Sequence, residues 1–189
     1  MFIRTARLTL RPGWPEDAPA LCAAIADRGI VKMLARAPWP YGPVDAAAFL
    51  AQPARAGEPN FLIFEHVDRA VRLIGSIGVH RDDAGALELG YWLRRDAWGR
   101  GYATEAGAAV LDTLRASLRI ERIGSGRFID NPASGRVLAK LGFVPTGAVE
   151  PRWSRARGVA VPCVLYESRT PSPLPLAGGV GGGLVEAAA

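Results

Sequence analysis

Apolar and polar positions repeat with two different periods along the chain, and these periods predict where strands and helices lie. Residues 87–93 place an apolar side chain at every second position, which is the period of a strand. Residues 105–118 change to apolar positions three and four apart, which is helical spacing. The connection, residues 98–104, contains Gly99 and Gly101. We therefore expect a strand, a glycine-rich turn and a helix in the middle of the chain.

The rest of the chain up to residue 169 divides into similar segments. β-branched and aromatic residues mark strands, and the short turn at 68–70 predicts that its two flanking strands pair antiparallel. Proline and acidic residues at 15–17 open a helix, and Asp130 or Asn131 caps another. The predicted strands are residues 8–12, 61–67, 72–80, 87–93, 122–128, 143–147 and 159–167, and the predicted helices are residues 15–25, 44–51, 105–118 and 133–141.

The order of these elements predicts the fold class. Antiparallel strands come first and a strand–helix–strand order follows, so we predict one α+β domain over residues 1–169. In it, a largely antiparallel sheet carries helices on both faces. Residues 170–189 are so rich in proline and glycine that they cannot bury a core, and we expect a disordered tail there.

The glycine-rich turn is the strongest candidate for a binding site. Without side chains at Gly99 and Gly101, the backbone can lie against a ligand, and the free N–H groups of the next helix favour a phosphate. A turn with nothing bound is the plain alternative. A second alternative is a dinucleotide-binding fingerprint, because Gly99 and Gly101 are spaced like its first two glycines. Glu121 follows about 20 residues later, where the fingerprint has an acidic residue that binds the ribose. Against the fingerprint, Thr104 replaces its third glycine and Glu121 opens a strand instead of closing one.

Three separated segments together resemble one known family. They are Thr5 to Pro12 followed by Asp17 and Ala18, then Trp98 to Ala106, then Asn131 to Ser134 running on to Phe143. In this order the chain resembles the GNAT superfamily of N-acetyltransferases, in particular the branch that acetylates the N-termini of ribosomal proteins. The resemblance implies that the sheet splays between strands 87–93 and 122–128. It also implies that acetyl-CoA is the co-substrate, with its pantetheine arm beside the first of these strands.

The same resemblance assigns roles to single residues. Glu88 would be the general base, with an exposed strand carboxylate as the alternative. Ser134 would assist the departing thiolate, because Ala139 stands where many relatives have a tyrosine. The alternative is that Ser134 is only a residue favoured in the first turn of a helix and has no part in the reaction. Backbone N–H groups near Trp92 would stabilise the oxyanion. The residues expected to bind the cofactor are Trp92, Leu93, Arg94, Arg95, Trp98, Gly99, Arg100, Gly101, Tyr102, Ala103, Thr104 and Asn131.

The acceptor implied by the resemblance is a primary amine, on a protein N-terminus or a small molecule. Trp39 and Tyr41 follow the first helices and are candidates for contacting it, although they could equally cap the core edge. The identity of the amine stays open, as does the choice between a monomer and a homodimer. A second hypothesis is an acetyl-CoA-binding regulatory module that has lost turnover, which the missing tyrosine favours.

Composition and charge narrow the partners further. The net charge is +5, and only Lys32 and Lys140 of the 23 basic residues are lysines. The arginines are dispersed, with the densest cluster at 152–157, so we expect no nucleic-acid partner. His66 and His80 have no ligand-spaced neighbours, so we expect no metal. Without a signal-peptide core or an 18-residue apolar run, we expect a cytoplasmic protein with no membrane partner.

Overall fold

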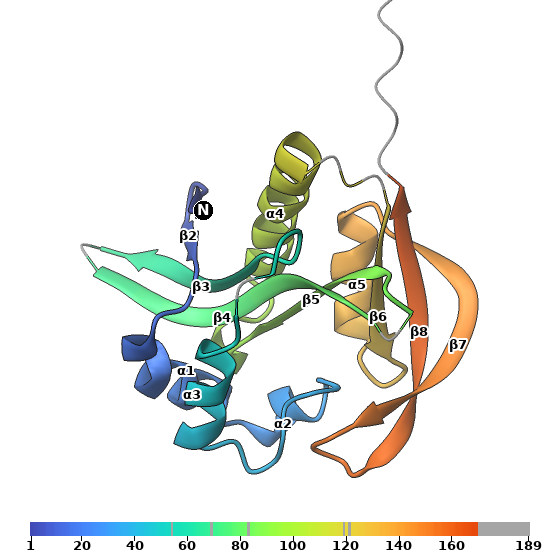
Figure 1. The fold of residues 1–189 in the computed structure, drawn as a ribbon, viewed down its shortest axis with the longest axis horizontal. Coiled ribbons are helices and arrows are strands. Elements are labelled where there is room, and N and C mark those ends of the chain that lie inside the picture. Colours follow the sequence, from blue (N-terminus) through green and yellow to red (C-terminus); the bar gives the residue numbers. More distant parts are fainter. Residues whose placement is uncertain (54, 69, 83, 119, 121, 170–189) are drawn as a thin grey trace, which may run out of the picture.

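An eight-stranded mixed sheet forms the centre of the protein (Figure 1). The computed structural model describes residues 1–169 apart from 54, 69, 83, 119 and 121. The spatial order of the strands is β1-β2-β3-β4-β5-β6-β8-β7, and all neighbours except β5 and β6 are antiparallel. The strands are β1 Ile3–Arg4, β2 Leu8–Arg11, β3 Asn60–Val67, β4 Ala70–Arg81, β5 Leu87–Leu93, β6 Arg122–Phe128, β7 Val144–Ser154 and β8 Val159–Arg169.

Helices cover both faces of this sheet. The helices α1, α2 and α3 lie on one side, and α4 and α5 lie on the other (Figure 1). The predicted α+β class is therefore confirmed. The helical segments are η1 Pro15–Asp17, α1 Ala18–Ile25, α2 Arg28–Val31, α3 Pro43–Leu50, η2 Arg95–Ala97, α4 Tyr102–Leu118 and α5 Pro132–Lys140. Among the described residues, none of these helices has the length and apolar character needed to cross a membrane.

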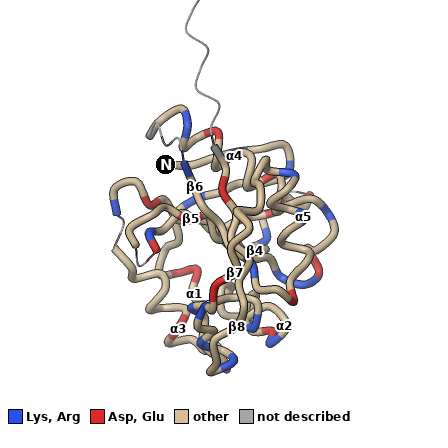
Figure 2. Tube along the Cα trace, turned by 90° about the vertical axis from the view of Figure 1, so that its right-hand side faces the viewer, with Lys and Arg blue, Asp and Glu red and all other residues tan. Residues whose placement is uncertain are grey.

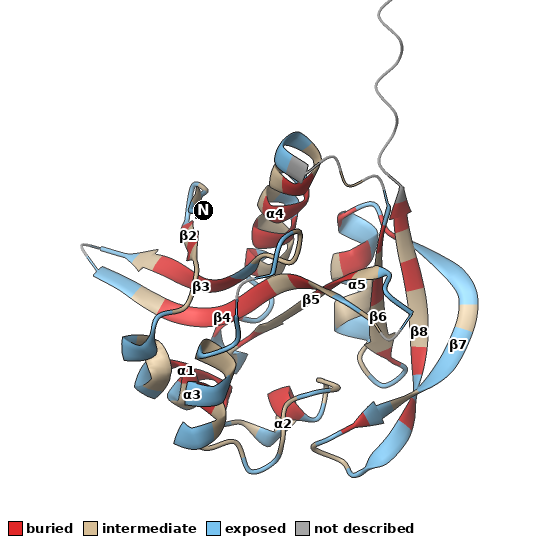
Figure 3. Ribbon diagram, viewed as in Figure 1, coloured by how far each residue is buried: buried red, intermediate tan, exposed pale blue. Residues whose placement is uncertain are grey.

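The alternation along β5 divides the core between the two faces. Leu89 and Leu93 are buried and pack in one cluster with Ala106 and Val110 of α4. Trp92 points to the other face and packs in the cluster under α1 and α3. Buried segments accordingly run through the central strands, while the outer strand β7 is mostly exposed (Figure 3). Positions 88 and 90 share the face of Trp92, so they open toward α1, α2 and α3.

The sheet opens between β5 and β6, as the resemblance implied. The two parallel strands meet at a single pair, Glu88 opposite Gly124. Beyond that pair the hydroxyl of Ser125 donates to the carbonyl oxygen of Leu89 at 2.8 Å. A side chain therefore replaces a backbone ladder bond here, and among the described residues no further residue of β5 pairs with β6.

One predicted strand was too short, and one short helix was missed. The predicted strand 143–147 runs on to Ser154, so the segment around Trp153, expected to be a connection, is strand. Nearly every β7 residue is exposed, so the strand lacks the apolar alternation by which sequence reveals strands. The short helix α2 was not predicted; Asp27 caps it by accepting from the N–H of Gly29. The predicted tail, 170–189, lies outside the described residues.

Candidate active site

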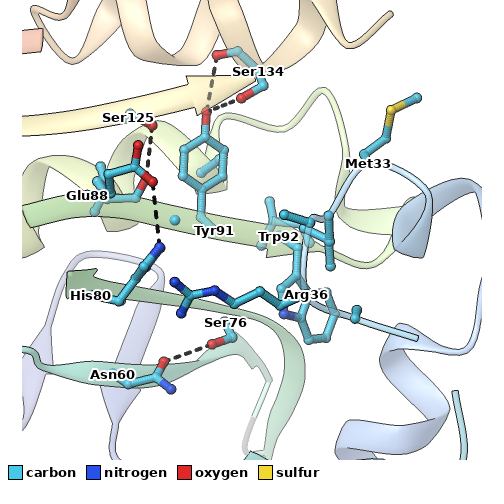
Figure 4. A pocket seen from close by; sticks show the side chains of 18 of the residues that line it. Met33, Arg36, Asn60, Ser76, His80, Glu88, Tyr91, Trp92, Ser125 and Ser134 are labelled. Atoms are coloured by element: carbon cyan, nitrogen blue, oxygen red, sulfur yellow. Dashed lines mark hydrogen bonds and ion pairs between the residues drawn. The ribbon is translucent and has the colours of Figure 1, made fainter. Parts of the chain in front are cut away.

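A cleft of about 1890 Å³ opens where β5 and β6 diverge. One wall comes from the glycine-rich loop, the start of α4 and the start of α5. The other comes from β4, β5, the loop after α2 and the outer strand β7. Figure 4 shows the centre of the cleft, where His80, Glu88, Tyr91 and Ser134 lie close to the divergence of the strands.

The glycine-rich loop has the backbone geometry of a phosphate-binding turn. Gly99 and Gly101 have φ values of 73° and 81°, which side chains rarely allow. A Cβ atom at Gly99 would have no neighbour within 4 Å, and one at Gly101 would meet only the end of Arg7 at 3.6 Å. Helix α4 begins at the next residue, Tyr102, so its free N–H groups face the same space. The loop therefore fits an anionic cofactor.

A buried carboxylate holds this loop in position. Glu65 of β3 is 4% exposed and forms ion pairs with Arg100 at 3.0 Å and Arg72 at 2.7 Å. It also accepts a hydrogen bond from the hydroxyl of Tyr102. Burial raises the pKa of Glu65, but the hydrogen bonds from Tyr102 and Arg72 outweigh it and leave the pKa below its usual value. In addition, the Trp98 indole donates to the carbonyl oxygen of Leu93 at 2.8 Å.

Three of the predicted cofactor residues direct their side chains elsewhere. Arg95 forms two hydrogen bonds of 2.8 Å with Asp27 and lowers the pKa of that carboxyl to about 2. Arg94 pairs with Asp96 at 2.6 Å and Arg100 with Glu65. None of the three lines the cleft, which corrects the prediction for these side chains. The predicted cofactor residues that do line it are Trp92, Leu93, Trp98, Gly99, Gly101, Tyr102, Ala103, Thr104 and Asn131.

Glu88 lies at the point of divergence in a buried ion pair. It is 7% exposed, so the alternative of an exposed strand carboxylate is wrong. Its two oxygens accept from Arg152 of β7 at 2.9 and 2.7 Å, and one of them lies 3.6 Å from Nε2 of His80. Burial raises the pKa of Glu88, but the neighbouring His80 and the hydrogen bonds and charge of Arg152 outweigh this and lower it to about 2.

His80 is a site residue that sequence reasoning missed. It lies directly opposite Glu88 in the β4–β5 ladder, and its side chain is 34% exposed. A Cβ atom at Gly90 would lie 3.5 Å from the imidazole, an ordinary van der Waals distance, so the ring packs over Gly90. The predicted strands 72–80 and 87–93 form a hairpin, and its register could have placed His80 opposite Glu88 from the sequence. Arg152 carried no such signal, because its strand was not recognised.

Tyr91 joins the predicted Ser134 on the cofactor side of the cleft. The hydroxyl of Tyr91 lies 2.8 Å from Oγ of Ser134 and also donates to its carbonyl oxygen at 3.1 Å. Asn131 is the cap of α5, accepting from the N–H of Ser134 at 3.2 Å. Burial raises the pKa of Tyr91 to about 12, although the Ser134 contact opposes the rise. A tyrosine hydroxyl is thus present, from β5 instead of the position of Ala139.

The two residues predicted to contact the acceptor differ in their position relative to the cleft. Tyr41 lines the cleft and packs against the clusters under α1, α2 and α3. Burial raises its pKa to about 12, so its hydroxyl stays protonated at neutral pH. Trp39 is 39% exposed and does not line the cleft, which corrects its assignment.

Comparison with known proteins identifies the class of this site. The family model described as an acetyltransferase (GNAT) domain matches residues 7–144. This is most of the chain, so the chain belongs to the GNAT family of acetyltransferases. Acetyl-CoA is therefore its co-substrate, and the glycine-rich loop at the start of α4 fits the phosphates of that molecule.

Individual relatives agree in length and fold. An uncharacterized N-acetyltransferase, p20, from Bacillus licheniformis is 28% identical over 168 residues, covering 86% of this chain and 92% of that protein. The ribosomal-protein-S5-alanine acetyltransferase of Vibrio fischeri has a TM-score of 0.74 at 18% identity, with 89% of this chain and 96% of that chain covered. A microcin C7 self-immunity acetyltransferase, solved with acetyl-CoA and AMP, has a TM-score of 0.73 at 20% identity, with 88% and 94% covered.

Proposed function

We propose that this protein transfers the acetyl group of acetyl-CoA directly to a primary amine, on a protein N-terminus or a small molecule, within a ternary complex. The observation that carries the proposal is the continuity of the cleft across the opening between β5 and β6. The glycine-rich loop lies on one side of the opening and the His80–Glu88 pair on the other. Both substrates can therefore meet there, and their proximity supplies much of the rate.

The chemistry of the cysteine in the cleft supports direct transfer over an acetyl-enzyme. Cys163 is the one cysteine among the described residues that line the cleft. Burial raises the pKa of its thiol, although the charge of Arg152 opposes the rise. The thiolate is the reactive form of cysteine, so a thiol with a raised pKa is a poor nucleophile.

The attacking amine must lose a proton, and we propose that two residues act together in this step. Glu88 alone is a weak base, since its pKa is about 2 and Arg152 occupies both of its oxygens. Imidazole is the usual proton acceptor near neutral pH. We therefore assign proton acceptance to His80, with Glu88 orienting the ring from 3.6 Å.

The remaining charges of the reaction develop on the oxygen and sulfur of the thioester. As the amine nitrogen bonds to the carbonyl carbon, the oxygen becomes negative, and backbone N–H groups near Trp92 on the free edge of β5 would stabilise it. The carbon–sulfur bond then breaks and coenzyme A leaves as a thiolate. The paired hydroxyls of Tyr91 and Ser134 would donate to that sulfur, because a tyrosine with a pKa of about 12 stays protonated.

Initial-rate kinetics test this proposal. Acetyl-CoA and an amine are varied together while release of the free thiol is followed. Intersecting double-reciprocal lines are expected for a ternary complex, whereas parallel lines would indicate an acetyl-enzyme and contradict the proposal. Acetyl-CoA binding without thiol release from any amine would support the regulatory-module hypothesis instead.

A further inference from the structure

The carboxylates that line the cleft are all engaged within the protein. Among the described residues, each accepts a hydrogen bond from a backbone N–H group or pairs with an arginine, so each already has a partner within the protein. They are Asp45 with the N–H of Gly42, Glu58 with Arg81, Asp82 with the N–H groups of Ala84 and Ala86, Glu88 with Arg152, and Asp130 with Arg157.

Arg36 lines the same cleft without an ion pair to a described carboxylate, as do Arg55, Arg127, Arg136 and Arg155. It is singled out because its side chain extends toward His80 (Figure 4). Its guanidinium donates to the carbonyl oxygen of Arg81 at 3.4 Å, and no described carboxylate forms an ion pair with it. Arg81 adjoins His80, so the positive charge lies beside the residue to which we assign proton acceptance. Figure 4 shows the Arg36 side chain reaching across the cleft past Trp92 toward His80.

The loop that carries Arg36 is fastened to the turn between β7 and β8. The N–H of Arg155 donates to the carbonyl oxygen of Ala35 at 2.9 Å. Arg157 donates to the carbonyl oxygen of Lys32 at 2.7 Å and pairs with Asp130 at 3.0 Å. Because its main chain is held in this way, Arg36 loses less conformational freedom on binding a ligand than a residue of an unrestrained loop would.

We propose that the acceptor is an amine with a carboxylate a few bonds away, and that Arg36 binds this carboxylate while the amine lies at His80. The inference rests on the proposed function. A guanidinium matches a carboxylate with two parallel hydrogen bonds, which fixes orientation as well as affinity. A second positive charge on the acceptor, placed at the same distance from the amine, would instead be repelled by Arg36.

Matched acceptors test the inference. The panel pairs β-alanine with its amide, and tripeptide amides that carry aspartate, asparagine or lysine at the second position. Carboxylate-bearing acceptors are expected to have a KM about tenfold lower than their neutral partners. The free amino acid and the peptides distinguish a small-molecule carboxylate from an acidic side chain. Equal KM values within each pair, or a preference for the lysine peptide, would overturn the inference.

Arg36→Met tests whether the preference for a carboxylate depends on Arg36, with Arg4→Met as the control. The control makes the same change in net charge, but Arg4 is exposed on β1 and does not line the cleft. Arg36→Met should raise the KM of carboxylate-bearing acceptors about tenfold and leave that of acetyl-CoA unchanged. An equal effect on the neutral acceptors would refute the assignment. If no amine is acetylated at all, the proposed function itself fails and the inference falls with it.

Discussion

Replacing Glu88 with glutamine tests the buried ion pair at the centre of the cleft, because the size of the side chain is kept and its charge is removed. The pKa of Glu88 is about 2, against an ordinary value of 4.5. This difference corresponds to ~3 kcal/mol of native-state stabilisation. Because the folded-state pKa is the lower one, the stabilisation is complete above the ordinary pKa and is lost as the pH falls toward 2.

Urea unfolding followed by tryptophan fluorescence measures this contribution. At pH 7 the Glu88→Gln variant should be ~3 kcal/mol less stable than the wild type, and at pH 3 the difference should fall to less than about half of that. Glu150→Gln is the matched control, since Glu150 is exposed on β7. Its effect should stay within about 0.5 kcal/mol. Equal stability of wild type and Glu88→Gln at pH 7, or a difference that does not change with pH, would refute the reasoning.

Three further substitutions test the reaction itself. His80→Gln should lower kcat about 100-fold with an unchanged KM for acetyl-CoA, measured by thiol release; wild-type kcat would remove His80 from the proton path. Gly99→Val should weaken acetyl-CoA binding about tenfold in calorimetry, because a side chain enters the phosphate space. Gly85→Val is the control, because Gly85 has a similar φ of 82° and does not line the cleft. An equal loss of acetyl-CoA affinity in Gly85→Val would contradict a phosphate site at Gly99. Tyr91→Phe should lower kcat about tenfold if the hydroxyl donates to the sulfur, and an unchanged kcat would exclude that role.

The elements that position the cofactor could be predicted because local patterns specify them. Alternation marks β5, helical spacing marks α4, and the two glycines between them have the positive φ values that a tight turn requires. These features depend on neighbours in sequence. The opening beside β5 was expected only through the family resemblance, and the single pair Glu88 with Gly124 confirms it.

The partners of the site residues could not be predicted, because they come from distant and exposed segments. Arg152 approaches Glu88 from β7, whose exposed positions show no strand period. Arg95 turns to Asp27, which lies 68 residues earlier, and so leaves the cleft. Long arginine side chains pair with whichever carboxylate the fold brings near, and sequence spacing does not reveal that choice.

Isothermal titration with acetyl-CoA, run beside NADH and ATP, measures which cofactor the glycine-rich loop binds. Acetyl-CoA should bind selectively at one site per chain, with weaker binding in the Gly99→Val variant and unchanged binding in Gly85→Val. Binding of NADH in place of acetyl-CoA would contradict the proposed acetyl transfer, because the glycine-rich loop would then hold a dinucleotide and the cleft would not be an acetyl-transfer site.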